Sequence, residues 1–309
     1  MNKVRDILKK INIAGSIEFN VPMEEHTSFK TGGPAEAFAV PADYNDISVL
    51  LKTCGRFSIP VFVLGAGANI LVADKGIRGL VISLASFQKI VVDGTVISAG
   101  AGAAMSDVAS AAGEASLSGL AFIYGMPGSV GGSVYMNARC YNREIADILH
   151  EARVMKSDGT VETLRPDRPA FSYKHSPFQT NKQVILSASF HCEKGDKQAL
   201  MDEMSRNKED RRQKGHYRYP SVGSVFKNNR SFGRPTGKII DNCGLKGYCI
   251  GDAQVADFHG NIIINRGNAG AGEILELILF IEEEVRKKTG FSLEREVILV
   301  GEWMDKEEP

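Results

Sequence analysis

The sequence has no long apolar run and no net charge. No stretch approaches the roughly 20 apolar residues that a membrane-spanning helix needs, although hydrophobic residues make up 43% of the 309. Lys plus Arg and Asp plus Glu each number 37, so the formal net charge is zero. We therefore predict a globular protein that inserts in no membrane and lacks the basic field typical of nucleic-acid binders. Any anionic ligand has to be bound by local groups.

Cysteine pairs and a secretion signal are also missing. The five cysteines are odd in number and scattered, with no C-x-x-C pair, which argues against a disulfide framework and against a structural zinc site. We predict no bound metal. In the first segment, MNKVRDILKKINIAG, charged residues interrupt each apolar stretch, so it does not have the pattern of a signal peptide. We therefore expect a cytoplasmic protein.

Glycine, in contrast, is abundant, and several glycines are clustered in loops, one of which directly follows an expected strand. There are 32 glycines, about 10% of the chain against a usual ~7%. The expected strand 61–64 runs into Gly65-Ala66-Gly67-Ala68-Asn69, where backbone N–H groups can approach phosphate oxygens because no Cβ obstructs them. The third glycine and the helix of a Rossmann fingerprint are missing. A tight turn without a ligand therefore remains an alternative.

A second and denser glycine loop occupies residues 124–137, YGMPGSVGGSVYMN. So many glycines are costly in backbone entropy unless a ligand or close packing requires them. A third loop, TSFKTGGP at 27–34, precedes the first expected strand of the glycine-rich half. Three such loops in one half of the chain favour an elongated cofactor that contains phosphate.

The pattern of strands and helices predicts an α+β fold with two domains. Short β-type runs alternate with turns from 35 to 164, and Asp93-Gly94 and Asp158-Gly159 indicate hairpins. Helices are expected at 46–54, 105–115, 196–214, 237–242 and 272–288. We predict an N-terminal helical segment within 1–20, a first domain at 21–195 and a second at 196–309. The last strand, 296–301, could pack back on the first domain.

Six motifs occur in the order and approximate spacing of the UDP-N-acetylenolpyruvoylglucosamine reductase (MurB) family. They are TSFKTGGPA, VLGAGANIL, GLAFIYGMPGSVGGSVYMNA, YPSVGSVFKN, GKIIDNCGLKGYCIGDAQV and LEREVILVG. The chain resembles this family from about residue 25 to 301, and its spacing looks like the shorter type II form. The resemblance implies an FAD-binding domain of the p-cresol methylhydroxylase (PCMH) and vanillyl-alcohol oxidase (VAO) type, followed by an α+β substrate-binding domain.

The resemblance also implies an activity. Such enzymes use NADPH to reduce FAD, and the reduced FAD converts UDP-N-acetylglucosamine enolpyruvate to UDP-N-acetylmuramate in peptidoglycan precursor synthesis, which serves cell-wall biogenesis, cell shape and division. We expect non-covalent FAD, NADPH as reductant, and no particular oligomer. The implied cofactor contacts are Gly65, Ala66, Gly67, Ala68 and Asn69 in one loop, and Gly125, Pro127, Gly128, Ser129, Gly131, Gly132 and Asn137 in the other.

Three residues match catalytic positions of the family. Ser224 matches a proton-donating serine, and Glu296 matches a catalytic glutamate. Side chains alternate along a strand, so Glu294 shares a face with Glu296 and the pattern alone does not choose between them. Lys174 stands where the family usually has arginine, which keeps the positive charge but loses the bidentate fork of a guanidinium group.

Two further residues, Lys227 and Asn228, resemble substrate contacts, with an ordinary polar turn as the alternative for Lys227. The chain departs from the family pattern at Arg139 and Asn142, where glycine is usual, and at 215–218. Two other functions stay open at this point. One is a different FAD-dependent sugar or alcohol oxidoreductase, for which His26 is the only candidate for a covalent histidine link near the glycine-rich loops. The other is a non-catalytic nucleotide-sugar binder.

Overall fold

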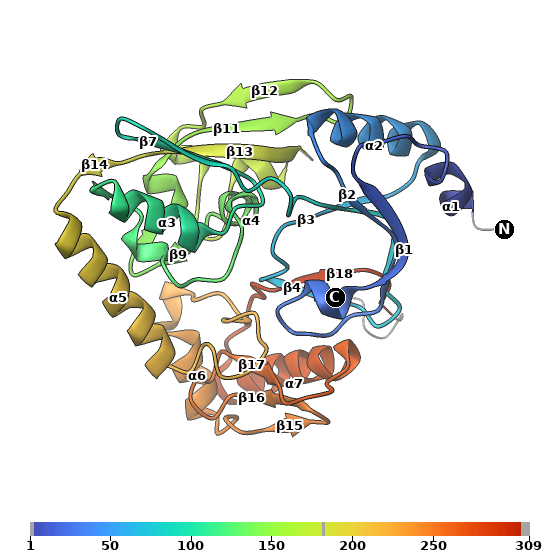
Figure 1. Cartoon of the computed structure of the whole chain (residues 1–309). Helices are drawn as coiled ribbons and strands as arrows, with labels where there is room; N and C mark the ends of the chain where they lie inside the picture. Colours follow the sequence, from blue (N-terminus) through green and yellow to red (C-terminus); the bar gives the residue numbers. More distant parts are fainter. Residues whose placement is uncertain (1–2, 181–182, 304–309) are drawn as a thin grey trace. The chain divides into compact units, whose positions relative to one another are not determined.

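The computed structural model describes residues 3–180 and 183–303 (Figure 1). Both compact units of the chain are assembled from segments that are separate in sequence. Unit 1 comprises Met1–Phe19, Glu36–Ala66 and Gly79–Asp210, and unit 2 comprises Asn20–Ala35, Gly67–Arg78 and Arg211–Pro309. Both contain helices and strands, as expected of an α+β fold. The predicted spans 21–195 and 196–309 were contiguous, whereas unit 2 takes two short segments from the first of them.

A five-stranded antiparallel sheet organises most of unit 1. Its order is β12 (Val161–Leu164), β11 (Leu149–Met155), β13 (Val184–His191), β7 (Val96–Gly100) and β6 (Ile90–Asp93). Asp93 pairs with Val96, and Met155 pairs with Val161, so both predicted hairpins are confirmed. Helices α3 (Met105–Glu114) and α4 (Val130–Tyr135) share one hydrophobic core with this sheet.

A second sheet has the order β1 (Ser16–Pro22), β2 (Pro34–Val40), β5 (Ile77–Ser83) and β3 (Val61–Leu64), with β3 and β5 parallel. Its core also takes in buried residues of α2 (Tyr44–Phe57) and of α1 (Lys3–Leu8). The buried carboxylate of Asp46, on α2, accepts hydrogen bonds from the N–H groups of Ala14, Gly15 and Ala42 at 2.8–2.9 Å. This one side chain therefore holds two segments, 14–15 and the residues just before α2, against the start of the helix.

Shorter elements complete the first two thirds of the chain. Strand β8 (Leu117–Ser118) pairs with β14 (Glu193–Lys194), and β9 (Arg139–Cys140) pairs with β10 (Arg143–Glu144). The charged helix α5 (Lys197–Gln213) buries only Leu200 and Met204 along its length. Met204 lies in the same core as α3 and α4, which explains why so polar a helix docks there.

Unit 2 is built around two helices, α6 (Thr236–Asn242) and α7 (Ala271–Thr289), and an antiparallel sheet of β15 (Cys249–Ile250), β16 (Ala253–Val255) and β17 (Ile263–Asn265). The last strand, β18 (Ile298–Val300), runs parallel to β4 (Ile70–Val72), with Ile298 opposite Ile70. The end of the chain thus pairs with a segment from its first half, although both strands belong to unit 2.

The cysteines are all free thiols, and three of them, Cys54, Cys192 and Cys243, are buried. Burial raises the pKa of the Cys54 thiol to about 11. Among the helices within 3–180 and 183–303, none is both long and apolar enough to span a bilayer.

Candidate active site

Ser224 lies in an extended segment of unit 2 that is bound on both sides by backbone hydrogen bonds. On one side Ser224 forms a β-bridge with Ile262, and the N–H of Val225 donates to the carbonyl of Asn261 at 2.9 Å. On the other side the carbonyl of Val225 accepts from the N–H of Glu296 at 2.7 Å. The expected strand around Ser224 is therefore reduced to isolated bridges to two distant segments, Ser224 with Ile262 on one side and Phe226 with Arg295 on the other. Ser224 and Glu296, both predicted from the sequence, are brought together by them.

The side chain of Asn261 reinforces this arrangement. It is 2% exposed, its Oδ1 accepts from the Phe226 N–H at 2.9 Å, and its Nδ2 donates to the Phe226 carbonyl at 2.8 Å. One amide thus satisfies both backbone groups of a buried residue, as a neighbouring strand would. Sequence analysis did not single out Asn261. The only available signal was a polar residue directly before the apolar run 262–264.

The structure separates the two glutamates that the strand pattern left equivalent. The Glu294 side chain is 72% exposed and pairs with Lys227, at 2.5 Å between Oε1 and Nζ. Glu296 is half-buried, and its carbonyl accepts from Asn69 Nδ2 at 2.9 Å. Both residues are bonded to the Ser224 segment through their backbones, Glu296 to the carbonyl of Val225 and Glu294 to the N–H of Lys227 at 2.8 Å, so it is the burial of its side chain that distinguishes Glu296. Asn69, an implied cofactor contact, has its amide on this backbone, and its role toward a cofactor stays a prediction.

A cavity of about 310 Å³ opens beside Ser224, entirely within unit 2. Asp241 in its wall contacts two lysines, Lys238 at 3.1 Å and Lys246 at 3.3 Å. The hydrogen bonds from Lys238 and Lys246 lower the pKa of Asp241. Two ammonium groups to one carboxylate leave the wall positively charged, which suits an anionic ligand. The lining residues are Ser224, Asn228, Pro235, Gly237, Lys238, Asp241, Lys246, Phe258, His259, Gly260 and Asn261.

His259 is a further titratable group of this cavity. Its Nδ1 accepts a hydrogen bond from the N–H of Asn261 at 3.1 Å, so the neutral ring carries its proton on Nε2. Burial and the neighbouring charges of Lys214 and Lys246 lower the pKa of His259. Sequence analysis missed His259, Lys238, Asp241 and Lys246, although three of these lie in or next to the quoted motif GKIIDNCGLKGYCIGDAQV. Only the fold shows that they face one cavity.

The two predicted substrate contacts have different positions. Asn228 lines the cavity, and its Oδ1 accepts from the N–H of Thr236, the first residue of α6, at 2.9 Å. The Lys227 carbonyl accepts from Thr236 Oγ1 at 2.8 Å, while its ammonium group is in the ion pair with Glu294. Asn228 thus shapes the cavity as well as lining it.

In unit 1, the first and second glycine loops approach each other closely. A Cβ on Gly65 would lie 2.5 Å from Ser129 Oγ and 3.7 Å from the N of Gly132, so a side chain at this position would displace the Ser129 hydroxyl. Ser129 is the N-cap of α4, and its buried Oγ accepts from the Gly132 N–H at 3.3 Å. Bare backbone therefore lines this junction, which is the kind of surface a diphosphate can approach. Gly65, Ser129 and Gly132 fit the predicted FAD site on this ground.

Several N–H groups of the second loop already have partners within unit 1. Gly131 donates to the Ala101 carbonyl at 2.9 Å, and Gly125 donates to Ser106 Oγ at 3.0 Å. A Cβ on Gly131 would lie 3.1 Å from that of Ala101. Gly131 is thus required for close packing whether or not a cofactor is bound. The predicted contacts from Gly125, Pro127, Gly128 and Gly131 stay predictions.

Gly67, in the first glycine loop, lies next to the start of the third loop (27–34) within unit 2. Gly67 has φ +63°, and a Cβ there would lie 2.0 Å from the carbonyl oxygen of His26. Its own carbonyl accepts from the N–H of Ser28 at 3.0 Å. The first and third glycine-bearing segments are therefore neighbours, as a shared ligand would require. Ala66 and Ala68 flank Gly67, and their cofactor role stays a prediction.

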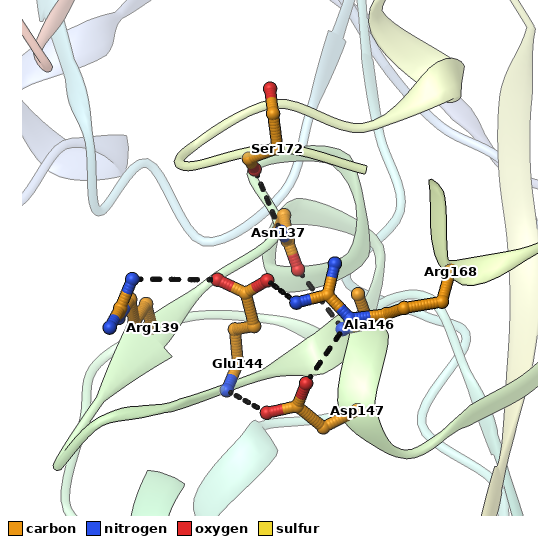
Figure 2. A network of polar contacts seen from close by, with 7 residues as sticks. All are labelled: Asn137, Arg139, Glu144, Ala146, Asp147, Arg168 and Ser172. Atoms are coloured by element: carbon orange, nitrogen blue, oxygen red, sulfur yellow. Dashed lines mark hydrogen bonds and ion pairs between the residues drawn. The ribbon is translucent and has the colours of Figure 1, made fainter. Parts of the chain in front are cut away.

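Lys174, the third catalytic candidate, lies on a tight turn of unit 1. Ser172 and His175 exchange backbone hydrogen bonds of 3.2 and 3.0 Å, and Lys174 between them has φ +59°, a conformation usual for glycine or asparagine at this place in a turn. The carbonyl of Ser172 also accepts from Asn137 Nδ2 at 2.9 Å (Figure 2). Asn137 is fully buried and uses its amide here, so its predicted contact with a cofactor stays a prediction.

Comparison with known proteins first gives the class. Residues 35–165 match the family described as "FAD binding domain", and residues 215–300 match "UDP-N-acetylenolpyruvoylglucosamine reductase, C-terminal domain". An FAD-binding domain joined to a second α+β domain defines a flavoprotein oxidoreductase.

Full-length relatives give the particular family. A UDP-N-acetylenolpyruvoylglucosamine reductase of Treponema denticola is 42% identical, over 98% of this chain and all of the relative. One of Caldanaerobacter subterraneus subsp. tengcongensis is 39% identical over 98% of each chain. The crystal structure of the Thermus caldophilus enzyme superposes with a TM-score of 0.79 at 31% identity, covering 93% of this chain and 99% of that one. The chain belongs to the UDP-N-acetylenolpyruvoylglucosamine reductase (MurB) family.

Proposed function

We propose that the protein reduces UDP-N-acetylglucosamine enolpyruvate to UDP-N-acetylmuramate, with NADPH as the source of electrons and non-covalent FAD as the carrier. In a cell this reaction supplies peptidoglycan precursors, and so supports cell-wall biogenesis, shape and division; we place it in the cytoplasm. The observation that carries the proposal is the backbone hydrogen bond from Glu296 to the residue after Ser224, beside a positively charged cavity.

The cavity of unit 2 suits the nucleotide-sugar part of this substrate. The diphosphate is anionic, and Lys238 and Lys246 present two ammonium groups against the single carboxylate of Asp241. Asn228 offers an amide for the sugar or base. Because Ser224 lies in the same wall, a substrate held here by its phosphates has its reacting end within reach of the hydroxyl.

The chain's own residues have separable tasks in the reaction. Bound FAD supplies hydride chemistry, and Gly65, Ser129 and Gly132 would hold its diphosphate. Once the enolpyruvyl group has gained a hydride, negative charge spreads into its carboxylate and the neighbouring carbon must gain a proton. Ser224 Oγ donates that proton, and the acid form of Glu296 donates a hydrogen bond to the developing enolate. Lys174 supplies a positive charge to it. Lys227, through its ion pair with Glu294, holds the segment that carries Ser224.

The two other functions considered from the sequence are less well supported. A different flavin oxidoreductase would need only the first domain, whereas the relatives match along the whole chain. A binder without activity would have no need of a serine hydroxyl in the wall of a charged cavity with a glutamate bonded to the next residue along the chain.

The test is a steady-state assay without oxygen. We expect purified protein with bound flavin to oxidise NADPH only when UDP-N-acetylglucosamine enolpyruvate is added. UDP-N-acetylglucosamine, which lacks the double bond, is the matched control and should give no turnover. A rate of NADPH oxidation that is the same with and without the enolpyruvyl substrate would overturn the proposal. A folded protein that binds no FAD would overturn it as well.

A further inference from the structure

The turn that carries Lys174 has a backbone conformation that lysine seldom adopts. Its φ of +59° is unfavourable for a residue with a Cβ, and such conformations persist only where the surrounding structure holds them. The turn itself contributes the pair of hydrogen bonds between Ser172 and His175. Further contacts must therefore hold Lys174 in place.

One of these contacts comes from Asn137. Its side chain is 0% exposed, and Nδ2 donates to the carbonyl of Ser172 at 2.9 Å, two residues before Lys174. At the other end of the amide, Oδ1 accepts from the N–H of Ala146 at 3.0 Å. Asn137 thus connects the Lys174 turn to a second segment, 144–147, and both bonds run through one rigid planar group.

The second segment is itself anchored by ion pairs. The Glu144 carboxylate, only 8% exposed, lies between the guanidinium groups of Arg168 and Arg139 (Figure 2). Arg168 also contacts Asp147 at 3.3 Å, and the Asp147 carboxylate accepts from the Glu144 N–H at 2.9 Å. Moving a buried carboxylate away from its cationic partners is costly, so these ion pairs restrain the segment. Ala146 lies within this segment, so Asn137 is bonded to a fixed point.

Two more contacts reach the same turn. The Arg139 guanidinium lies over the ring of Tyr173, 5.6 Å from its centroid, so Arg139 connects the ion-pair network directly to the residue before Lys174. Beyond the turn, Gln179 Nε2 donates to the Lys174 carbonyl at 3.1 Å and to the Tyr135 carbonyl at 2.9 Å. The turn is held from both ends by side chains of unit 1.

We infer that Asn137 is a positioning residue for Lys174, acting through the carbonyl of Ser172. Removing the Nδ2 donor lets the Ser172 carbonyl rotate, the turn relaxes toward negative φ at Lys174, and the ammonium group moves from the position that it needs for catalysis. The inference rests on the proposed function, in which Lys174 stabilises the substrate's developing charge. It assigns Asn137 a task that contact with a cofactor would not predict.

Hydrogen exchange on the FAD-loaded protein tests the structural half without any need for activity. Asn137→Asp keeps the acceptor, loses the donor and tolerates the residue's φ of +43°. Asn137→Gly removes both bonds without burying a charge, in case the aspartate variant does not fold. The controls are Asn142→Asp and Asn142→Gly, at an exposed residue of φ +62°. We expect the His175 amide to exchange at least about tenfold faster in the Asn137 variants only. Equal exchange in both pairs would overturn the inference.

A double-mutant cycle tests the catalytic half. Displacement by about 1 Å can cost on the order of a hundredfold, so we expect the Asn137 variants to lose about ten- to a hundredfold in kcat for the enolpyruvyl substrate. Flavin reduction by NADPH alone should stay within about twofold of wild type. In a Lys174→Met background the same changes should cost less than about twofold more. If the loss in kcat from the Asn137 change were as large in the Lys174→Met background as in the wild type, the inference would be overturned. Equal loss of flavin reduction would also overturn it, marking Asn137 as a cofactor residue.

The proposed function can fail separately. If the wild-type protein does not reduce the enolpyruvyl substrate, the activity is refuted while the exchange of the His175 amide still decides whether Asn137 holds the turn.

Discussion

The catalytic candidates of the two units are held in different ways. In unit 2, backbone hydrogen bonds between three segments set Ser224 and Glu296, with Val225 bonded to Asn261 on one side and to Glu296 on the other. In unit 1, Lys174 lies on a turn of unfavourable φ, and buried side chains such as Asn137 hold it. Backbone pairing survives most substitutions nearby, whereas a side-chain anchor is lost with one change. Apart from Asn261, whose amide holds both backbone groups of Phe226, unit 2 should therefore tolerate mutation around its catalytic residues better than unit 1.

The largest effect is expected at Ser224. Ser224→Ala should slow substrate reduction by about 10²- to 10⁴-fold, the usual contribution of a general acid, and leave flavin reduction by NADPH near wild type. Because backbone bonds hold the segment, the variant should unfold at the wild-type temperature. Rapid-mixing kinetics of the two half-reactions and a thermal melt make the measurement. Ser221→Ala, three residues earlier, is the matched control, and an equal loss there would make Ser224 a structural residue.

A somewhat smaller loss is expected at Lys174. Lys174→Met should lower kcat by about a hundredfold, as removal of one charge-stabilising donor does, and Lys174→Arg should keep most of the activity. All three side chains have the same backbone preference, so strain at this φ cancels from the comparison. Lys194→Met, on an exposed strand of unit 1, controls for loss of a surface charge. A methionine variant as active as wild type would remove Lys174 from the mechanism.

A third prediction extends the comparison to stability, through another buried side chain of unit 1. Burial alone would raise the pKa of Asp46, but hydrogen bonds from the backbone amides of Ala42, Ala14, Gly15 and Asp43 outweigh it and lower the pKa from 3.8. Asp46→Asn keeps one oxygen as an acceptor, but it replaces the other oxygen with an NH₂ group that faces backbone N–H donors and cannot accept from them. We expect it to cost about 1.5–3 kcal/mol of unfolding free energy at pH 7, the range for hydrogen bonds to charged groups.

The pH dependence of this loss has a definite sign. Because the folded pKa lies below the unfolded one, the stabilisation from Asp46 is complete above the unfolded value and disappears as pH falls through the folded value. The gap between wild type and Asp46→Asn should therefore narrow below about pH 4 in urea unfolding. Asp107→Asn, an exposed residue at the start of α3, should show no such gap. A gap at Asp46 that stays constant down to pH 2 would contradict the assignment.

The smallest effect concerns His259 in the cavity of unit 2. Burial and then Lys214 lower its pKa below 6.5, so the ring is neutral at pH 7 in the free protein. A bound diphosphate favours the charged ring, so affinity for UDP-N-acetylglucosamine should rise several-fold between pH 8 and pH 6. The ligand's phosphates do not titrate in this range. Calorimetric titration of wild type and His259→Gln makes the test, and equal pH slopes would place the phosphates away from His259.

Much of unit 1 could be predicted because its signals are local. The alternation of Val184–His191 and the Asp93-Gly94 turn determine a strand and a hairpin within a few residues. The helix α4 was not expected, since VGGSVY has two glycines and only the cap of Ser129 and the packing against Ala101 make it helical. Propensity there is overridden by tertiary contacts.

The organisation of unit 2 depended on distant pairings that leave no local pattern. Nothing in Ile70–Val72 indicates that it will pair with Ile298–Val300. The choice between Glu294 and Glu296 likewise required the position of Lys227, which pairs with the first of them. The resemblance to a family identified the candidate residues, but the positive φ of Lys174 and the hydrogen bond from Asn137 to Ser172 are evident only in the folded chain.

The central claim is that this chain passes a hydride and a proton to an enolpyruvyl double bond, and a single turnover tests it most directly. The flavin is reduced with one equivalent of NADPH in the absence of oxygen and is then mixed with UDP-N-acetylglucosamine enolpyruvate. The absorbance of the flavin is followed over time, and the mass of the product is measured by mass spectrometry. We predict that the flavin is re-oxidised by the substrate and that the product is heavier by two hydrogen atoms. Flavin that stays reduced, or substrate recovered at its original mass, would contradict the account.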